Sequence, residues 1–245
     1  MKISTVFLFV MILFFSSCKK SQDRRCFKSY GNIAELEVDI DSIQEFKLYG
    51  GIVYNFYQDT LRKLVIRGGE NVISFIDVTQ ENYEVSINNL NSCDFLRDYD
   101  DKITVDIHYP HYTSIYAEPT EKMRFVDTLS GNQTKIELRN GGESLDLNVD
   151  VNRLFLNVSY GTGIINVYGR TGFLKLATQN LGRINALGIK ADNMFIYQNS
   201  ITDMSVNFDS TNVKIHFNGN GDIRFVGIPN LVEITGNGEG EVISY

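Results

Sequence analysis

The stretch Leu154–Phe173, LFLNVSYGTGIINVYGRTGF, decides the fold, because imperfect copies of it precede and follow it. The unit before it is Thr134–Arg153, and later units begin at Leu174, Met194, Val213 and Leu231. The unit length falls from 20 to 18 residues, and the last unit is truncated at Tyr245. A period this constant indicates a repeat architecture.

Each unit contains two alternating apolar runs separated by a small, polar or Gly-rich turn. In the quoted unit, Leu154, Leu156 and Val158 precede the turn SYGTG, and Ile165 and Val167 follow it. Alternation with period two places such side chains on one face of a strand. Each unit therefore predicts one coil of a β-solenoid, stacked on its neighbours at about 4.8 Å per rung.

A single coil could not fold alone. About five inward side chains contribute roughly 1.5–3 kcal/mol each, which does not outweigh the ordering of some 20 residues at about 1–2 kcal/mol each. A β-sandwich of regular hairpins is the alternative, but the constant period favours the solenoid. The predicted register places these residues in the core: Val158, Val167, Ile215, Phe217 and Phe225.

The preceding half of the chain is β-rich but lacks a clean 20-residue period. It contains five strand candidates: Glu35–Ile40, Phe46–Tyr57, Leu61–Arg67, Tyr83–Asn88 and Lys102–Tyr109. An end rung without a cover would expose an open strand edge. We therefore predict a β-rich N-terminal cap region over 34–133 and solenoid coils over 134–245, as one continuous domain over 34–245.

Composition agrees with an all-β protein and excludes one class of partner. The 245 residues include 20 Gly, 3 Pro and no Trp, and Val, Ile, Tyr and Phe are frequent. The net charge of −7 and the sequence pI of 5.0 disfavour nucleic-acid binding, because no basic stripe could neutralise a phosphate backbone.

The first residues have the pattern of a targeting signal. Lys2 is followed by the apolar run Val6–Phe15, which is too short for a transmembrane helix. The sequence Phe15-Ser16-Ser17-Cys18 resembles a bacterial lipobox. This resemblance implies a signal peptide over 1–17, a diacylglycerol on Cys18 and a tether over 18–33. An ordinary signal peptide with a chance cysteine is the alternative.

A lipid-anchored protein of this kind would lie in the cell envelope, and the outer membrane is the expected location, on either its periplasmic or its surface side. In that oxidising location Cys26 and Cys93 could form a disulfide. Its loop of about 66 residues would stabilise the fold by roughly 4 kcal/mol in the chain-entropy model. Nothing in the sequence indicates that the two cysteines are close.

The strand and corner near Phe46–Tyr57 are followed by LVIRGGENVISFIDVTQENYEVSINN, by ITVDIHYPHYTSIYA and then by the Gly/Asn-punctuated coils. This order resembles the putative auto-transporter adhesin "head GIN" domain family of Bacteroidota-type envelopes, over Ile33–Glu241. The resemblance implies a right-handed parallel β-helix, commonly behind a lipoprotein signal, and supplies no catalytic residues. The chain departs from the family pattern at Tyr116–Glu118, where a small Ser/Gly-rich segment is typical.

The sequence contains no catalytic, cofactor or metal signature. His108 and His111 frame a turn, and their three-residue offset on a strand does not aim two imidazoles at one ion. His216 alternates with Ile215 and Phe217 and should point outward. The acidic run CDFLRDYDD, with Asp94, Asp98, Asp100 and Asp101, lacks the glycine turn and closing glutamate of a calcium loop.

We therefore expect a non-enzymatic binding, adhesion-like or structural module without a cofactor, with glycans or other envelope proteins as partners. The outward residues of the coils are expected to be mainly Asn, Ser, Thr, Tyr and isolated charges. A polysaccharide-acting β-helix lyase or hydrolase is the alternative function. Lys175, Arg183 and Asp222 do not align at one coil position, which disfavours it.

One short motif, Asp followed by Ser or Thr and then an aliphatic residue or Thr, occurs four times where about one match is expected by chance. It is similar to the O-glycosylation sequon of Bacteroidota envelope proteins. The alternative is that Asp-Ser and Asp-Thr simply favour turns. The candidate acceptors are Ser42, Thr60, Thr128 and Ser210.

Overall fold

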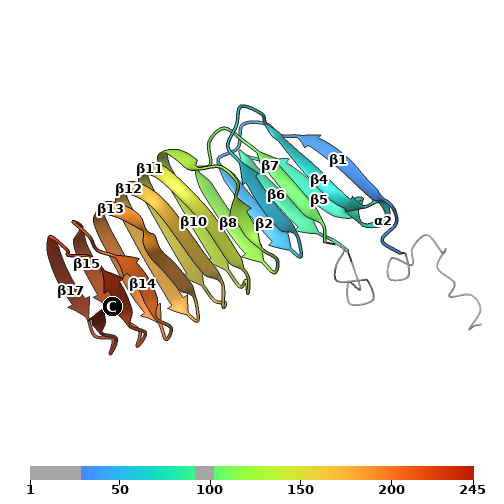
Figure 1. Ribbon diagram of the computed structural model, residues 1–245. Helices are drawn as coiled ribbons and strands as arrows, with labels where there is room; N and C mark the ends of the chain where they lie inside the picture. Colours follow the sequence, from blue (N-terminus) through green and yellow to red (C-terminus); the bar gives the residue numbers. More distant parts are fainter. Residues whose placement is uncertain (1–28, 92–101) are drawn as a thin grey trace, which may run out of the picture.

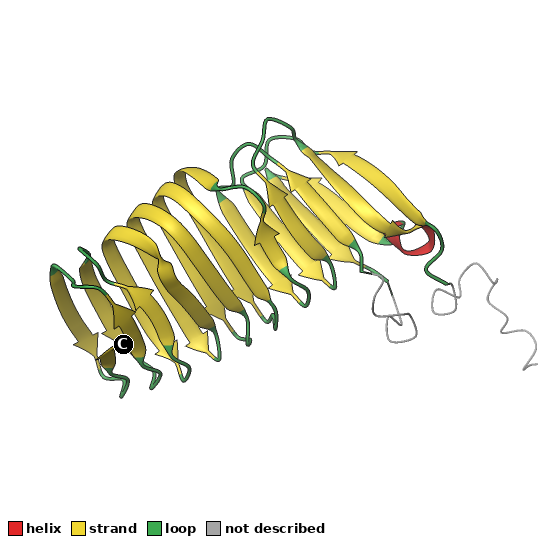
Figure 2. Cartoon of the chain, viewed as in Figure 1, coloured by secondary structure: helices red, strands yellow, loops and turns green. Residues whose placement is uncertain are grey.

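The computed structural model describes residues 29–91 and 102–245, which form a rod of β-strands with about seven solenoid turns (Figure 1). Figure 2 shows one short helix at the N-terminal end of the rod. In this described part of the chain, no helix has the length and apolar character needed to cross a membrane. The elements are β1 (Ile33–Asp39), β2 (Glu45–Gly50), β3 (Val53–Tyr57), β4 (Lys63–Gly69), α2 (Glu70–Ile73), β5 (Ile76–Glu81), β6 (Glu84–Asn89), β7 (Thr104–His108), β8 (Ser114–Pro119), β9 (Met123–Phe125), β10 (Leu129–Arg139), β11 (Ser144–Ser159), β12 (Ile164–Asn180), β13 (Arg183–Ser200), β14 (Met204–Asn207), β15 (Asn212–Phe217), β16 (Ile223–Val226), β17 (Leu231–Gly236) and β18 (Val242–Ser244).

The coils stack in parallel to build two faces. The first face contains, in spatial order, β6, β2, β8, the end of β10, the second halves of β11, β12 and β13, and then β15 and β17. The second face contains β7, β3, β9, the first halves of β11, β12 and β13, and then β14, β16 and β18. The long strands β11–β13 therefore cross the corner that joins the two faces.

The register of these pairs converts the 20-residue period into columns of stacked side chains. On the inner side of the first face, Ile136, Leu156, Leu176, Ile196 and Ile215 are successive register partners. None of the five is more than 1% exposed. Each such side chain contributes roughly 1.5–3 kcal/mol by leaving water, so the stacking of coils supplies the burial that one coil lacks.

The predicted core is confirmed for four of its five residues, since Val158, Val167, Ile215 and Phe217 are buried. Phe225 is only half-buried, although it packs on the core. Its ring stacks on that of Phe208 with 4.9 Å between centroids, but only β18 follows its rung. Its register partner on β18 is Ser244, a small side chain that leaves part of the ring uncovered.

The N-terminal end of the rod departs from the sequential order of coils. The β2–β3 rung lies between the β6–β7 rung and the β8–β9 rung, although β2 and β3 come first in the chain. Antiparallel strands close this end, because β4 pairs with β7, β1 with β4, and β5 with β6. Parallel stacking therefore begins well before Thr134, and the antiparallel cover is limited to β1, β4 and β5 with helix α2.

Aromatic rings fill the core of these N-terminal rungs. Phe46 packs against Tyr109 and Tyr112, with centroids 5.2 and 5.5 Å apart, and Phe56 stacks on Phe125 at 4.6 Å. The Tyr109 hydroxyl donates to the carbonyl of Ile43, and the Tyr112 hydroxyl donates to that of Ile107. The buried hydroxyls are thus paired, as a low-dielectric interior requires.

A glycine fixes the corner between the two faces in one central coil. Gly169 has φ +104°, and a Cβ at this position would lie 2.1 Å from the carbonyl oxygen of Val149 on the preceding rung. Only glycine combines this conformation with so close a backbone approach.

Candidate functional site

The outer side of the first face carries a column in which cations and aromatic rings alternate. Lys135, Phe155, Lys175, Phe195 and Lys214 are successive register partners on β10, β11, β12, β13 and β15. Four of these residues are 20 residues apart in sequence, so the repeat itself places them in line. Because each column residue belongs to a different rung, the column runs along the axis of the rod.

The adjacent outer column differs in size from rung to rung. It consists of Glu137, Asn157, Ala177, Tyr197 and His216. The small side chain of Ala177 lies between the larger Asn157 and Tyr197, and a groove of about 460 Å³ forms there. The groove is lined by Lys135, Glu137, Phe155, Leu156, Asn157, Lys175, Ala177, Gln179, Phe195 and Tyr197.

The walls of this groove are aromatic and held in place by neighbouring rings and cations. The Phe155 ring lies 5.9 Å from that of Phe173, and the Arg153 guanidinium lies 5.5 Å from both centroids. The Tyr197 ring stacks on His216, at 5.5 Å between centroids and 6° between planes. Contacts of this kind restrict ring motion and leave half-buried aromatic faces for a ligand.

One polar atom of a groove-lining residue has no hydrogen-bond partner among the described residues. Asn157 Oδ1 is buried, and no hydrogen-bond donor from the described residues reaches it. An unsatisfied buried acceptor is uncommon in folded proteins and is often explained by function. This oxygen has almost no solvent-accessible surface, so it is not itself a contact point for a ligand in the groove.

The charges of the groove are mixed, with an excess of cations. The Lys135 ammonium lies 3.6 Å from Glu137, and both are partly exposed. Lys175 makes no ion pair in the described part of the chain, and its Nζ lies 5.7 Å from the centroid of the Phe195 ring. Among the described residues that line the groove, Glu137 is the one carboxylate.

Tyr116–Glu118, where the sequence departs from the family pattern, lies on β8 in regular parallel pairing with β2 and β10. The Tyr116 hydroxyl donates to Glu118, and burial together with this hydrogen bond raises the pKa of Tyr116 to about 12. Tyr116 also packs against Tyr49 on the neighbouring strand, at 6.0 Å between centroids. The departure is thus accommodated within the sheet.

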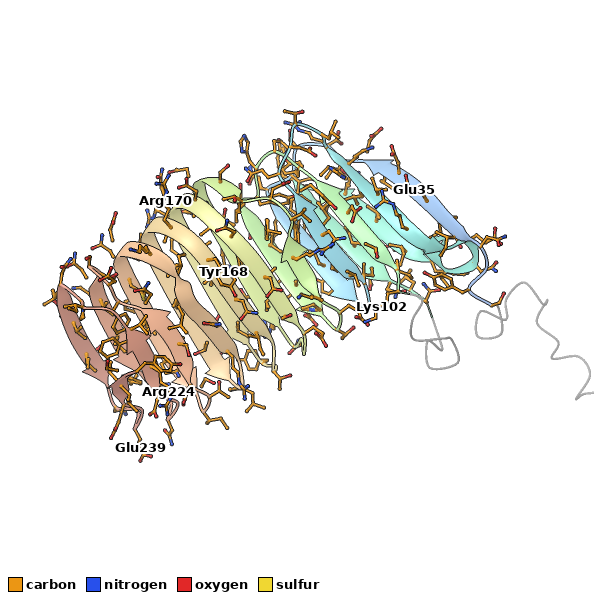
Figure 3. The ribbon with its side chains drawn as sticks, in the orientation of Figure 1. Glu35, Lys102, Tyr168, Arg170, Arg224 and Glu239 are labelled. Atoms are coloured by element: carbon orange, nitrogen blue, oxygen red, sulfur yellow. The ribbon has the colours of Figure 1, made fainter. Side chains whose placement is uncertain are left out.

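A second concave region lies at the corner after the second face, and four of its charged groups form two ion pairs. Arg170 donates two hydrogen bonds to Asp150, at 2.8 and 2.7 Å, and Lys190 lies 3.7 Å from Asp209. The hydrogen bond from Arg170 lowers the pKa of Asp150. Figure 3 shows Arg170 on the opposite edge of the rod from Arg224. We interpret these ion pairs as links between successive rungs rather than as a ligand site.

The four candidate glycosylation acceptors, Ser42, Thr60, Thr128 and Ser210, are all exposed and lie outside the strands. Thr60, Thr128 and Ser210 follow β3, β9 and β14, so they share one edge of the rod. The hydroxyl of Ser42 accepts a hydrogen bond from Arg62, and that of Thr128 accepts one from Asn148.

The remaining sequence candidates are separated or fall outside the described residues. His108 Nδ1 lies 2.7 Å from Asp59, and the exposed His111 is not part of that contact. In the described ranges, no group of three His, Cys, Asp or Glu residues could hold a metal ion. Cys18, Cys26, Cys93 and the acidic run with Asp94, Asp98, Asp100 and Asp101 lie outside the described residues.

The expectation for the outer surface named mainly Asn, Ser, Thr, Tyr and isolated charges. It left out three phenylalanines that the first face also presents, Phe155, Phe173 and Phe195. The signal was available in the sequence as Lys135, Phe155, Lys175 and Phe195 at one position of four successive units.

A family model described as "Putative auto-transporter adhesin, head GIN domain" matches residues 43–229. The chain belongs to this family. The head GIN family is adhesin-like, which indicates a cell-envelope or surface protein. No curated protein matches the chain.

Solved structures share the fold of this head GIN protein at low sequence identity. A putative adhesin from Bacteroides fragilis is 18% identical with a TM-score of 0.74, covering 87% of this chain and 97% of that chain. A putative adhesin from Parabacteroides merdae is 20% identical with a TM-score of 0.65, covering 89% and 98%. A putative lipid binding protein from Parabacteroides distasonis is 16% identical with a TM-score of 0.61, covering 88% and 97%.

Proposed function

We propose that this protein is a non-enzymatic adhesin module of the cell envelope that binds glycans in the groove on its first face. The observation that supports this most directly is the set of half-buried rings, Phe155, Phe195 and Tyr197, that line the groove. The apolar face of a sugar ring stacks on aromatic rings, and its hydroxyls donate to amide oxygens. Gln179 supplies an amide at the groove wall.

The charged groups of the groove support binding rather than hydrolysis. Glycoside hydrolases commonly use two carboxyl groups that flank the scissile bond. Glu137 is the one carboxylate that lines the groove in the described part of the chain, and it faces Lys135. We therefore favour a binding module over the hydrolase alternative.

The proposed anchor is a lipid on Cys18, with residues 1–17 removed as a signal peptide and the outer membrane as the location. The support is the small-residue pattern before Cys18 after an apolar run too short to span a membrane. The same envelope location would allow Cys26 and Cys93 to pair, and would expose Ser42, Thr60, Thr128 and Ser210 to envelope glycosylation.

The test of glycan binding is a glycan array probed with the detergent-purified full chain and with two variants. Phe195→Ala removes a wall of the groove and should abolish the signals seen with the unmodified chain. Tyr168→Ala is the matched control, because Tyr168 is 49% exposed and lies on the second face. An array without signal, or equal signals from the Phe195→Ala and Tyr168→Ala variants, would refute glycan binding in this groove.

A further inference from the structure

The outer column that runs through the groove alternates lysine and phenylalanine side chains at a regular spacing. Cations occupy its first, third and fifth rungs, at Lys135, Lys175 and Lys214, with the rings of Phe155 and Phe195 between them. Neighbouring rungs are about 4.8 Å apart, so like residues recur about every 9.6 Å. That repeat is close to the length of two sugar units in an extended chain.

The cations of the column are accessible to a ligand. The side chains of Lys135 and Lys214 are 54% and 65% exposed, and Lys175 is exposed as well. Lys135 and Lys214 each have a carboxylate neighbour, Glu137 at 3.6 Å and Glu233 at 2.9 Å. Exposed pairs of this kind contribute at most about 1 kcal/mol, so a ligand carboxylate can compete for the lysines. Lys175, in the middle of the groove, has no such competitor in the described part of the chain.

We propose that the groove binds a linear polysaccharide in which a uronic acid alternates with a neutral sugar, lying along the axis of the rod. This rests on the proposed glycan-binding function and assigns its ligand class. The carboxylates contact Lys135 and Lys175, and the neutral sugars stack on Phe155 and Phe195. A chain that crossed the rod would meet a single rung and only one of these two contact types.

The column also sets the length of ligand that it can bind. From the Lys135 rung to the Lys214 rung there are four steps, or about 19 Å. This corresponds to roughly two disaccharide repeats. Affinity should therefore rise from a disaccharide to a tetrasaccharide and change little from a hexasaccharide to an octasaccharide.

The probes are unsulfated hyaluronan oligosaccharides, which alternate glucuronic acid with N-acetylglucosamine, and the same oligosaccharides with their carboxyl groups reduced. Binding to the full chain is measured by calorimetry at low and high salt. The acidic oligosaccharides should bind more tightly, and only their binding should weaken with salt. Lys175→Met should weaken binding of the acidic form about threefold and leave the reduced form unchanged.

Lys175→Arg keeps the charge and should retain tight binding. Lys190→Met is the control, because it removes another exposed cation that lies outside the groove. Equal affinity for acidic and reduced oligosaccharides, or equal effects of Lys175→Met and Lys190→Met, would overturn the assignment of the acidic ligand. In that case glycan binding lost in Phe195→Ala would still support the proposed function. If Phe195→Ala still bound both the acidic and the reduced oligosaccharides, the acidic-ligand assignment and the proposed function would both be overturned.

Discussion

Replacing Phe217 with Asp is the sharpest test of the coil register. Phe217 is 3% exposed on β15, and its register partners are Gln198 and Gly236 on the adjacent rungs. Removing a buried Phe side chain costs about 3–5 kcal/mol, and burying an unpaired carboxylate costs several kcal/mol more. The sum, about 6–10 kcal/mol, is comparable to the total stability of a typical domain.

Because each rung contacts only its neighbours, the damage should be concentrated in the C-terminal coils. Hydrogen exchange should show loss of amide protection in β15 and β17, and urea unfolding should lose its cooperative character. His216→Asp is the matched control, since the adjacent His216 faces outward and can keep a carboxylate in water. A Phe217→Asp protein with the protection pattern and urea midpoint of His216→Asp would show that the inward register is wrong.

Three further predictions concern the anchor, a corner and acid stability. Cys18→Ala should move the protein from the membrane fraction to the soluble fraction, and a variant that stays membrane-bound would contradict lipidation. Gly169→Ala should lower the free energy of unfolding in urea by at least about 2 kcal/mol, because its positive φ and the backbone oxygen 2.1 Å away exclude a Cβ. Gly142→Ala is the control and should be nearly neutral, since the nearest atom to its Cβ would be 3.5 Å away. The hydrogen bond from Arg224 lowers the pKa of Asp203 below 3.8, so its ionised form stabilises the fold above that pH and the contribution is lost as pH falls through the folded-state pKa. Asp203→Asn should therefore lower the urea midpoint more at pH 6 than at pH 2, and an equal loss at both would argue against this linkage.

The inner pattern of the coils could be predicted from sequence because it depends on one local rule. Alternation with period two, repeated every 20 residues, requires Val158 and Val167 to face inward whatever the rest of the chain does. The same rule works less well at Phe225, because its burial depends on the side chain that covers it on the next rung, which is the small Ser244. Local periodicity specifies which way a side chain points, whereas its burial also depends on the side chains of the adjacent rungs.

The arrangement of the N-terminal rungs could not be predicted in the same way. The position of β2–β3 between β6–β7 and β8–β9 rests on pairings between strands that are remote in sequence. No local pattern in Glu45–Tyr57 distinguishes an inserted rung from a terminal one. The aromatic contacts of Phe46 and Phe56 with Tyr112 show what favours the insertion, since they fill a core that adjacent rungs share.

The side chains of the outer column stay aligned although the coils differ in length, because one coil places its extra residue outside the first face. Between β12 and β13, Asn166 pairs with Asn185 and Tyr168 with Gly188, so Leu187 is one additional residue opposite a single partner. Before this bulge the paired residues of β12 and β13 are 19 apart in sequence, and after it they are 20 apart. The bulge therefore confines the difference in length to the second face, ahead of the corner. Lys175 and Phe195 therefore remain register partners, as do Phe195 and Lys214, although the second pair is 19 residues apart rather than 20. A one-residue slip within the first face would turn these side chains into the core. Length variation confined to bulges and corners thus keeps cations and rings aligned along one line of the rod.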